Sequence, residues 1–140
     1  MTLHLLKLAV GVSDLAELRR IQRERRKLRG FYCFCFYTRN TPRRQEEVLD
    51  GGSIYWVIKG QVRARQRIRG FVPILNQHGK MACLVKIEAR VTPTLAQPRR
   101  AFQGWRYLRP EEAPPDRSAG GRDDGMPAAM ADELRALGLL

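Results

Sequence analysis

The stretch Ser53-Ile-Tyr-Trp-Val-Ile-Lys-Gly-Gln-Val-Arg-Ala-Arg-Gln-Arg-Ile-Arg69 decides the fold of this chain. Apart from Ser53, residues 53–58 are β-branched or aromatic, a composition that predicts a strand. Lys59-Gly60-Gln61 predicts a tight turn or bulge, and the alternating segment 62–69 predicts a second strand. Two strands joined in this way form an antiparallel hairpin. We therefore expect a sheet built around residues 53–69.

The second strand of this hairpin carries an arginine at every other position. Because successive strand residues point to opposite faces, one face is expected to hold Val62, Ala64, Gln66 and Ile68. The other face is then expected to hold a row of four arginines, each about 6.6 Å from the next: Arg63, Arg65, Arg67 and Arg69. Such a row repels itself unless negative charge lies beside it, and a phosphate accepts two hydrogen bonds from one guanidinium.

Three explanations of the arginine row stay open. An external polyanion, such as a nucleic-acid backbone, would neutralise it. Acidic groups of the chain itself would also do so, whether from the C-terminal segment or from the preceding helix with Glu46, Glu47 and Asp50. Alternatively, the arginines are solvated charges that protect an edge strand from pairing with other sheets.

Helical and strand-like segments flank the hairpin. Asp14 and Glu17 have the spacing of a helix capping box, and Leu15, Leu18 and Ile21 share one helical face after it. The expected strands are 2–12, 31–38, 81–91 and 102–108, and the expected helices are 14–28, ended by Gly30, and 43–49. The order of elements predicts a single α+β domain with a mostly antiparallel sheet and flanking helices.

The basic charge of the chain is concentrated in its first 110 residues. The 140 residues include 26 Lys and Arg against 14 Asp and Glu, a net charge of +12. Residues 1–110 hold 23 basic and 7 acidic residues (+16), whereas residues 111–140 hold 3 basic and 7 acidic residues (−4). Because solubility alone needs a magnitude of only about 2–8 in a small domain, this charge favours a polyanionic partner. The acidic end could compete with that partner for the basic face.

Composition also divides the chain. We expect residues 1–110 to form the basic α+β domain, and residues 111–127, rich in Pro, Gly and acidic residues, to form a linker. Residues 128–140 are expected to include a short amphipathic C-terminal helix that packs on the domain.

Aromatic residues beside the basic segments suggest contacts with bases. Rings next to a basic groove stack on nucleic-acid bases, although Trp56 is expected in the core because strand tryptophans are mostly buried. The residues predicted to bind nucleic acid are Arg63, Arg65, Arg67, Arg69, Lys59, Tyr55, Trp105, Arg106 and Tyr107.

The sequence contains no known motif for catalysis, cofactor binding or metal binding. His4 is expected to be a packed strand residue and His78 a solvated turn residue. Cys33, Cys35 and Cys83 are expected to be reduced thiols, so we predict no metal and no cofactor. Enzymatic activity is uncertain, and binding is the preferred interpretation. The alternatives are a small hydrolase or nucleotide-processing enzyme that uses Glu46, Glu47 or Asp50, and a basic module for an acidic protein or anionic membrane surface. No stretch is long and apolar enough to span a membrane, and we expect a cytoplasmic protein.

Several motifs together carry a resemblance to a known family. They are Leu3-His4-Leu5 to Gly11-Val12, Thr41-Pro42-Arg43-Arg44, Leu49-Asp-Gly-Gly-Ser-Ile-Tyr-Trp-Val-Ile-Lys-Gly-Gln61, Arg65-Gln66-Arg67-Ile68, Phe102-Gln-Gly-Trp-Arg-Tyr-Leu108 and Leu137-Gly-Leu-Leu140. The chain resembles an alphaproteobacterial domain-of-unknown-function family of about this length. The resemblance covers nearly the whole chain and implies a bacterial protein, but no activity.

A second resemblance is to PUA-like RNA-binding barrels, including the ASCH group. Those folds have a turn, a strand, a glycine turn and then a strand with an alanine at its centre. Here the same order is given by Asp50-Gly51, Ile54–Ile58, Gly60 and the strand around Ala64. The turn reads Asp-Gly rather than Gly-Asp, and the ASCH signature is absent. This resemblance implies a barrel-like sheet and favours RNA over DNA as the partner.

Overall fold

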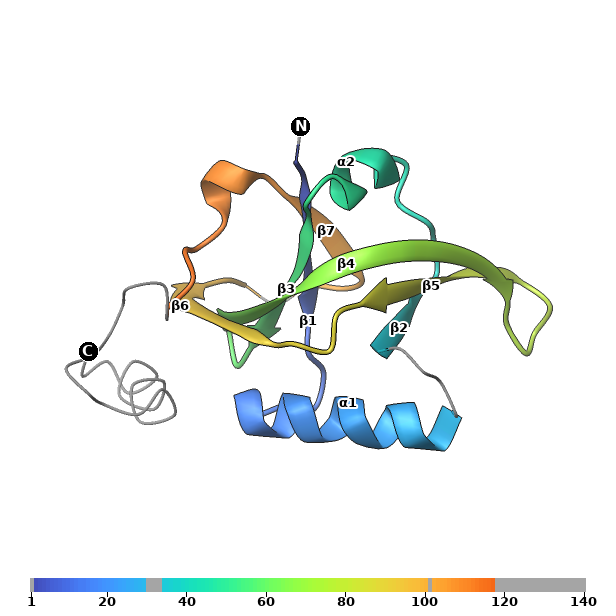
Figure 1. Cartoon of the computed structure of the whole chain (residues 1–140), viewed down its shortest axis with the longest axis horizontal. Helices are drawn as coiled ribbons and strands as arrows, with labels where there is room; N and C mark the ends of the chain where they lie inside the picture. Colours follow the sequence, from blue (N-terminus) through green and yellow to red (C-terminus); the bar gives the residue numbers. More distant parts are fainter. Residues whose placement is uncertain (1, 30–33, 101, 118–140) are drawn as a thin grey trace.

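The computed structural model describes residues 2–29, 34–100 and 102–117. In the first helix, side chains are described only as far as residue 26. The secondary-structure elements and the overall arrangement are shown in Figure 1. In chain order they are β1 (His4–Leu8), α1 (Leu15–Arg29), β2 (Phe34–Thr38), α2 (Gln45–Leu49), β3 (Ser53–Ile58), β4 (Gln61–Leu75), β5 (Met81–Ile87), β6 (Thr92–Pro98), β7 (Trp105–Leu108) and the 3-10 turn η1 (Pro110–Glu112).

The strands form one mixed sheet of seven strands. Its order is β2-β5-β4-β3-β1-β7, with β6 also paired to β4. Among the described strands, β1 and β3 pair in parallel and the other pairs are antiparallel. This confirms an α+β domain with a mostly antiparallel sheet. The sheet is not closed, so the barrel-like sheet implied by the PUA-like resemblance is not confirmed.

β4 is longer than predicted, and one further strand was not predicted at all. β4 continues through Gly70 and Pro73 to Leu75 and pairs with β5 beyond a register shift between Ile68 and Gly70. β6 contains Pro93 and Pro98. Glycine and proline ordinarily mark the ends of strands, which is why the sequence pattern predicted neither the extension nor β6.

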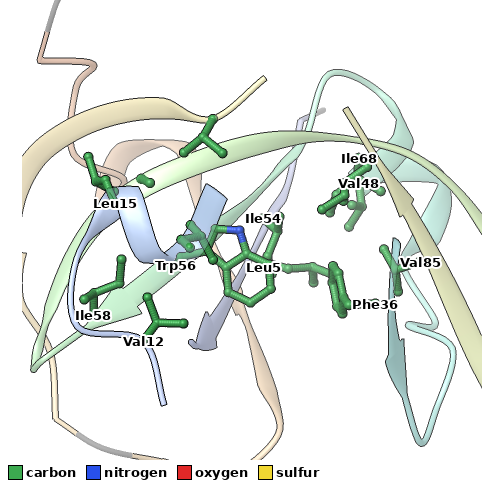
Figure 2. Close-up of a cluster of buried hydrophobic side chains, with 14 of the residues drawn as sticks. Leu5, Val12, Leu15, Phe36, Val48, Ile54, Trp56, Ile58, Ile68 and Val85 are labelled. Carbon is green, nitrogen blue, oxygen red and sulfur yellow. The ribbon is translucent and has the colours of Figure 1, made fainter. Parts of the chain in front are cut away.

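The main hydrophobic core lies between α1 and the sheet. Leu15 and Leu18 of α1 are buried there against strand residues that include Leu5, Ile54 and Trp56. Figure 2 shows Trp56 in the middle of this cluster, near Leu5 and Ile54. The prediction that Trp56 is a core residue is therefore confirmed. The cap of α1 is also confirmed in part, because the Glu17 amide donates to the Asp14 carboxylate at 2.8 Å.

The alternation of β4 is interrupted by a β-bulge. Trp56 pairs with Ala64 whereas Val57 pairs with Val62, so Arg63 is the extra residue. A bulge of one residue shifts the following side chains to the opposite face. Val62 therefore packs with Leu6 and Leu108 in the second, smaller cluster, not with Ala64 and Ile68 as expected.

A buried polar contact ties α1 to β4. Gln66 is 1% exposed, and its amide oxygen accepts from Trp56 Nε1 and Gln22 Nε2, both at 2.8 Å. Its amide nitrogen donates to Gln22 Oε1 at 2.8 Å and to the Glu88 carbonyl at 2.9 Å. Each polar atom of the side chain thus has two partners, which makes the amide compatible with the core.

Residues 110–117, which we call the strap, lie on the side of the sheet away from α1, in orange in Figure 1. The Leu95 amide donates to the Pro115 carbonyl at 2.9 Å, and the Arg117 amide donates to the Pro93 carbonyl at 3.0 Å. The start of the segment expected to be a linker thus contacts β6. The rest of that segment and the expected C-terminal helix lie outside the described residues, and the division into domain, linker and helix stays a prediction. None of the described helices is long and apolar enough to cross a membrane.

Candidate anion-binding pocket

A polar pocket of about 480 Å³ lies between the strap and three adjacent strands. β1 supplies His4, β3 supplies Ser53 and Tyr55, and β4 supplies Arg65 and Arg67. The strand register places these residues together, because Tyr55 pairs with Arg65 and Ser53 with Arg67. The strap closes one side with Pro110 and Ala113–Asp116. We refer to this space as the pocket.

A tight backbone crossing positions the β3 side of the pocket. The Gly52 amide donates to the Val48 carbonyl at 2.7 Å, and its carbonyl accepts from the Ile68 amide at 3.1 Å. A Cβ at this position would lie 2.2 Å from the Leu3 carbonyl oxygen and 2.3 Å from that of Val48. Glycine is therefore required where α2 leads into β3, immediately before Ser53.

The four arginines of β4 do not form one exposed row. Arg63 is buried, with 7% of its surface exposed, at the bulge. Arg69 is exposed and forms an ion pair with Glu88. Only Arg65 and Arg67 line the pocket. The expected row was wrong because alternation holds only in a regular strand, and β4 has one register shift at Arg63 and another at Arg69.

Arg65 is held by an acidic residue of the chain itself. Its Nε and Nη2 donate to the two carboxylate oxygens of Asp116, each at 2.7 Å. Its Nη1 donates to Ser53 Oγ at 3.2 Å. The hydrogen bond from Arg65 lowers the pKa of Asp116. The acidic C-terminal segment, one of the alternatives considered for the arginine row, thus reaches it at Arg65.

Arg67 differs from its neighbours on β4. Its Nε is buried and has no hydrogen-bond partner within the described ranges. A buried N–H without a partner costs about 1–3 kcal/mol, and more when the group is charged. Arg67 also lines the pocket, which makes this group a candidate donor to an acceptor bound there.

His4 contributes a neutral ring to the pocket. Its Nδ1 accepts a hydrogen bond from the Ser53 amide at 3.0 Å, so the proton of the neutral ring is on Nε2. Burial lowers the pKa of His4, and the nearby Arg65 lowers it further. With His4 neutral, the two arginines and Asp116 give this group of side chains a net charge of +1. The arrangement can bind an anion and can donate hydrogen bonds to it.

Stability should depend on the protonation of His4. The pKa of His4 in the folded protein lies below its ordinary value of 6.5, so the unfolded chain binds the proton more readily. The stability contributed by neutral His4 is complete above pH 6.5 and is lost as the pH falls from there toward the lowered pKa. Asn can accept the Ser53 amide without titrating. We therefore expect urea unfolding at about pH 7.5 and about pH 5.5 to show a smaller acid loss in His4→Asn than in the wild type.

The matched control for this prediction is His78→Asn. His78 is exposed in the turn between β4 and β5, so its removal should leave the acid loss unchanged. An equal acid loss in the wild type and in His4→Asn would contradict the assignment.

The remaining predicted nucleic-acid residues are dispersed. Tyr55 lines the pocket, whereas Lys59 lies exposed in the hairpin turn. Trp105 and Tyr107 are partly buried against the main core and meet edge to face, with ring centroids 4.9 Å apart. Arg106 is exposed, with its guanidinium 5.2 Å from the centre of the Phe102 ring. Trp105, Arg106 and Tyr107 do not line the pocket.

The carboxylates considered for a hydrolase, Glu46, Glu47 and Asp50, lie outside the pocket. Glu47 forms an ion pair with Arg44, and Glu46 and Asp50 are exposed. None of the three lines the pocket, whose carboxylate, Asp116, is bound by Arg65. In the described part of the chain, Cys35 is half-buried, Cys83 is buried, and no group of three or more His, Cys, Asp or Glu side chains lies close enough to hold a metal. Cys33 lies outside the described residues.

Sequence reasoning missed three polar residues of the pocket, His4, Ser53 and Asp116. His4 was expected to be only a packed residue, and neither Ser53 nor Asp116 was a candidate. The Asp50-Gly51-Gly52-Ser53 turn was a usable signal, because two glycines before a strand indicate a close backbone approach. Nothing in the local sequence indicated Asp116, which lies 51 positions from Arg65.

Together, the fold and the pocket define a small basic α+β domain with an arginine-lined polar site on its sheet. A family described as protein of unknown function, DUF1489, matches residues 5–140, so the chain belongs to this family. No curated protein and no solved structure matches the chain.

Proposed function

We propose that this protein binds RNA and that the pocket holds one of its phosphate groups. The observation that carries the proposal is the buried Nε of Arg67, which has no partner within the described ranges and belongs to a residue lining the pocket. A guanidinium in such a setting is well suited to phosphate, because it always carries its charge and offers donors in a fixed plane.

The surroundings of the pocket support a polyanion. Arg90 is exposed and close enough to lower the pKa of Asp116 in the pocket wall. The first 110 residues carry a charge of +16, which attracts phosphate chains from a distance and weakens with salt. RNA is proposed ahead of DNA on the sequence resemblance of the region from Asp50 to Ile68 to PUA-like domains alone, since the sheet is not closed into their barrel.

The test compares two arginines of the same strand. Labelled single-stranded RNA, duplex RNA and duplex DNA are titrated with the wild type, Arg67→Gln and Arg69→Gln by fluorescence anisotropy. Both variants lose one positive charge, but only Arg67 lines the pocket, whereas Arg69 is paired with Glu88. Because a hydrogen bond to a charged group contributes about 1.5–3 kcal/mol, Arg67→Gln should weaken RNA binding about tenfold or more. Arg69→Gln should change it less than about threefold.

A salt series supplies the second criterion. For a single strand, the logarithm of the binding constant should fall with the logarithm of the salt concentration by about 0.7 per neutralised phosphate. Equal weakening by the two variants would mean that binding follows net charge and not the pocket. Failure of all three nucleic acids to bind at low salt would reject the proposed function, and an acidic protein partner would then be the better candidate.

A further inference from the structure

Four hydrogen-bond donors of the residues lining the pocket could serve the oxygens of a bound phosphate. Besides Arg67 Nε–H, the lining residues carry the hydroxyl groups of Ser53 and Tyr55 and the Nε2–H of neutral His4. Ser53 Oγ accepts from Arg65, so its own proton is left to donate to a ligand. Burial raises the pKa of Tyr55, which keeps its hydroxyl group protonated at neutral pH. These four donors come from three adjacent strands.

A phosphodiester and a phosphate monoester differ in how they could use this set. An internal phosphodiester has two unesterified oxygens and one negative charge. A monoester has three such oxygens and carries a charge of about −1.5 to −2 at neutral pH. With Arg90, which also acts on Asp116, the three arginines and Asp116 give this side of the molecule a net charge of +2. A monoester balances that charge better than a phosphodiester does, and its third oxygen can accept from donors in more directions.

The shape of the pocket points in the same direction. Ser53 and Tyr55 are almost fully buried, at 0% and 5% exposed, so they form its floor. The strap closes one side, where Asp116 is fastened by Arg65 and Pro114 is buried. An internal phosphate would need room for the chain to leave in two directions, whereas a terminal phosphate needs only one. A volume of about 480 Å³ suits a single nucleotide or smaller group.

We propose that the pocket recognises a terminal phosphate monoester, presented by the end of an RNA strand. This inference rests on the proposed function, because RNA binding delivers the phosphate. The same group is also present in a free nucleoside monophosphate, so the test has to separate the two sources.

The experiment uses the full chain and three labelled RNA oligomers of one sequence: one with a 5′-phosphate, one with a 3′-phosphate and one with hydroxyl groups at both ends. We expect an oligomer with the recognised phosphate to bind at least about tenfold more tightly than the hydroxyl-ended oligomer, because charge-assisted hydrogen bonds are gained. This advantage should disappear in Arg67→Gln and persist in Arg69→Gln. Arg67→Lys keeps the charge but not the Nε–H and should lose most of the advantage.

Each contrary result has its own meaning. Equal affinity for all three oligomers would overturn the terminal-phosphate inference while leaving RNA binding intact. Absence of binding to every oligomer would reject both proposals. Unlabelled adenosine monophosphate is added as a competitor to test whether the ligand is a free nucleotide. If it displaces the phosphorylated RNA at a concentration near the Kd of that RNA, the ligand is the free nucleotide and the RNA-end proposal is overturned.

Discussion

Gly52→Ala is expected to unfold the protein or to lower its Tm by about 10 °C or more. The added Cβ would meet two carbonyl oxygens, of Leu3 at 2.2 Å and of Val48 at 2.3 Å. Both belong to the backbone, so neither can move aside by changing a rotamer, and the Gly52 amide is itself bonded to Val48. Overpacking of this severity costs about 3 kcal/mol or more, and each kcal/mol corresponds to about 3–5 °C in a domain of this size. Thermal unfolding followed by circular dichroism measures the change.

Gly70→Ala is the matched control for this substitution. It introduces the same methyl group into the same sheet, but the nearest atom is Lys86 Cδ at 4.0 Å. Alanine is also better suited than glycine to a strand interior. The Tm of Gly70→Ala should therefore stay within about 4 °C of the wild type. If the Tm of Gly52→Ala also stayed in this range, the backbone crossing before Ser53 would not be as close as described.

Gln66→Leu should lower the free energy of unfolding by about 3 kcal/mol. Leucine is close to glutamine in size, so the loss comes from the partners that the amide leaves behind. Trp56 Nε1, the Glu88 carbonyl and the Gln22 amide all lose their bonds to Gln66. Gln22 is half-buried and can bond to water instead. A buried polar group without a partner costs about 1–3 kcal/mol, and two such groups remain. Urea unfolding gives the difference directly.

Gln22→Met provides the control for Gln66→Leu. It also removes the two amide bonds between Gln22 and Gln66, but it leaves the bonds of Gln66 to Trp56 and Glu88 in place. Gln22 is only half-buried, so water can replace part of what is lost. We expect a loss of about 1 kcal/mol. If Gln22→Met is as costly as Gln66→Leu, the bonds to Trp56 and Glu88 are not the source of the stability.

The fold was predictable where local patterns agree with the final contacts. β3 and the hairpin turn, the capped start of α1 and the buried position of Trp56 all follow from residue type and spacing. The pattern was less informative where tertiary pairing overrides a local preference. β4 continues past Gly70 and Pro73 because β5 pairs with it, and a bulge places Val62 on the face opposite to the one its alternation indicates.

The candidate site was predictable only in part. Arg65, Arg67 and Tyr55 were identified because their residue types suit phosphate, and the structure places all three at the pocket. Their grouping with His4 depends on the parallel pairing of β1 with β3, between strands that are distant in the chain. The pairing of Arg65 with Asp116 depends on the anchoring of the strap to β6. Such long-range contacts leave no periodic signal in a single sequence.

The most direct test of RNA binding at the pocket is the NMR signal of the Arg67 Nε–H group, followed in ¹⁵N-labelled protein as RNA is added. We expect this signal to shift and its exchange with water to slow, because a phosphate oxygen becomes its acceptor. The Nε–H signal of Arg69, outside the pocket and paired with Glu88, should change little. An unchanged Arg67 signal under conditions where RNA is bound would contradict RNA binding at the pocket and place the RNA elsewhere on the basic surface.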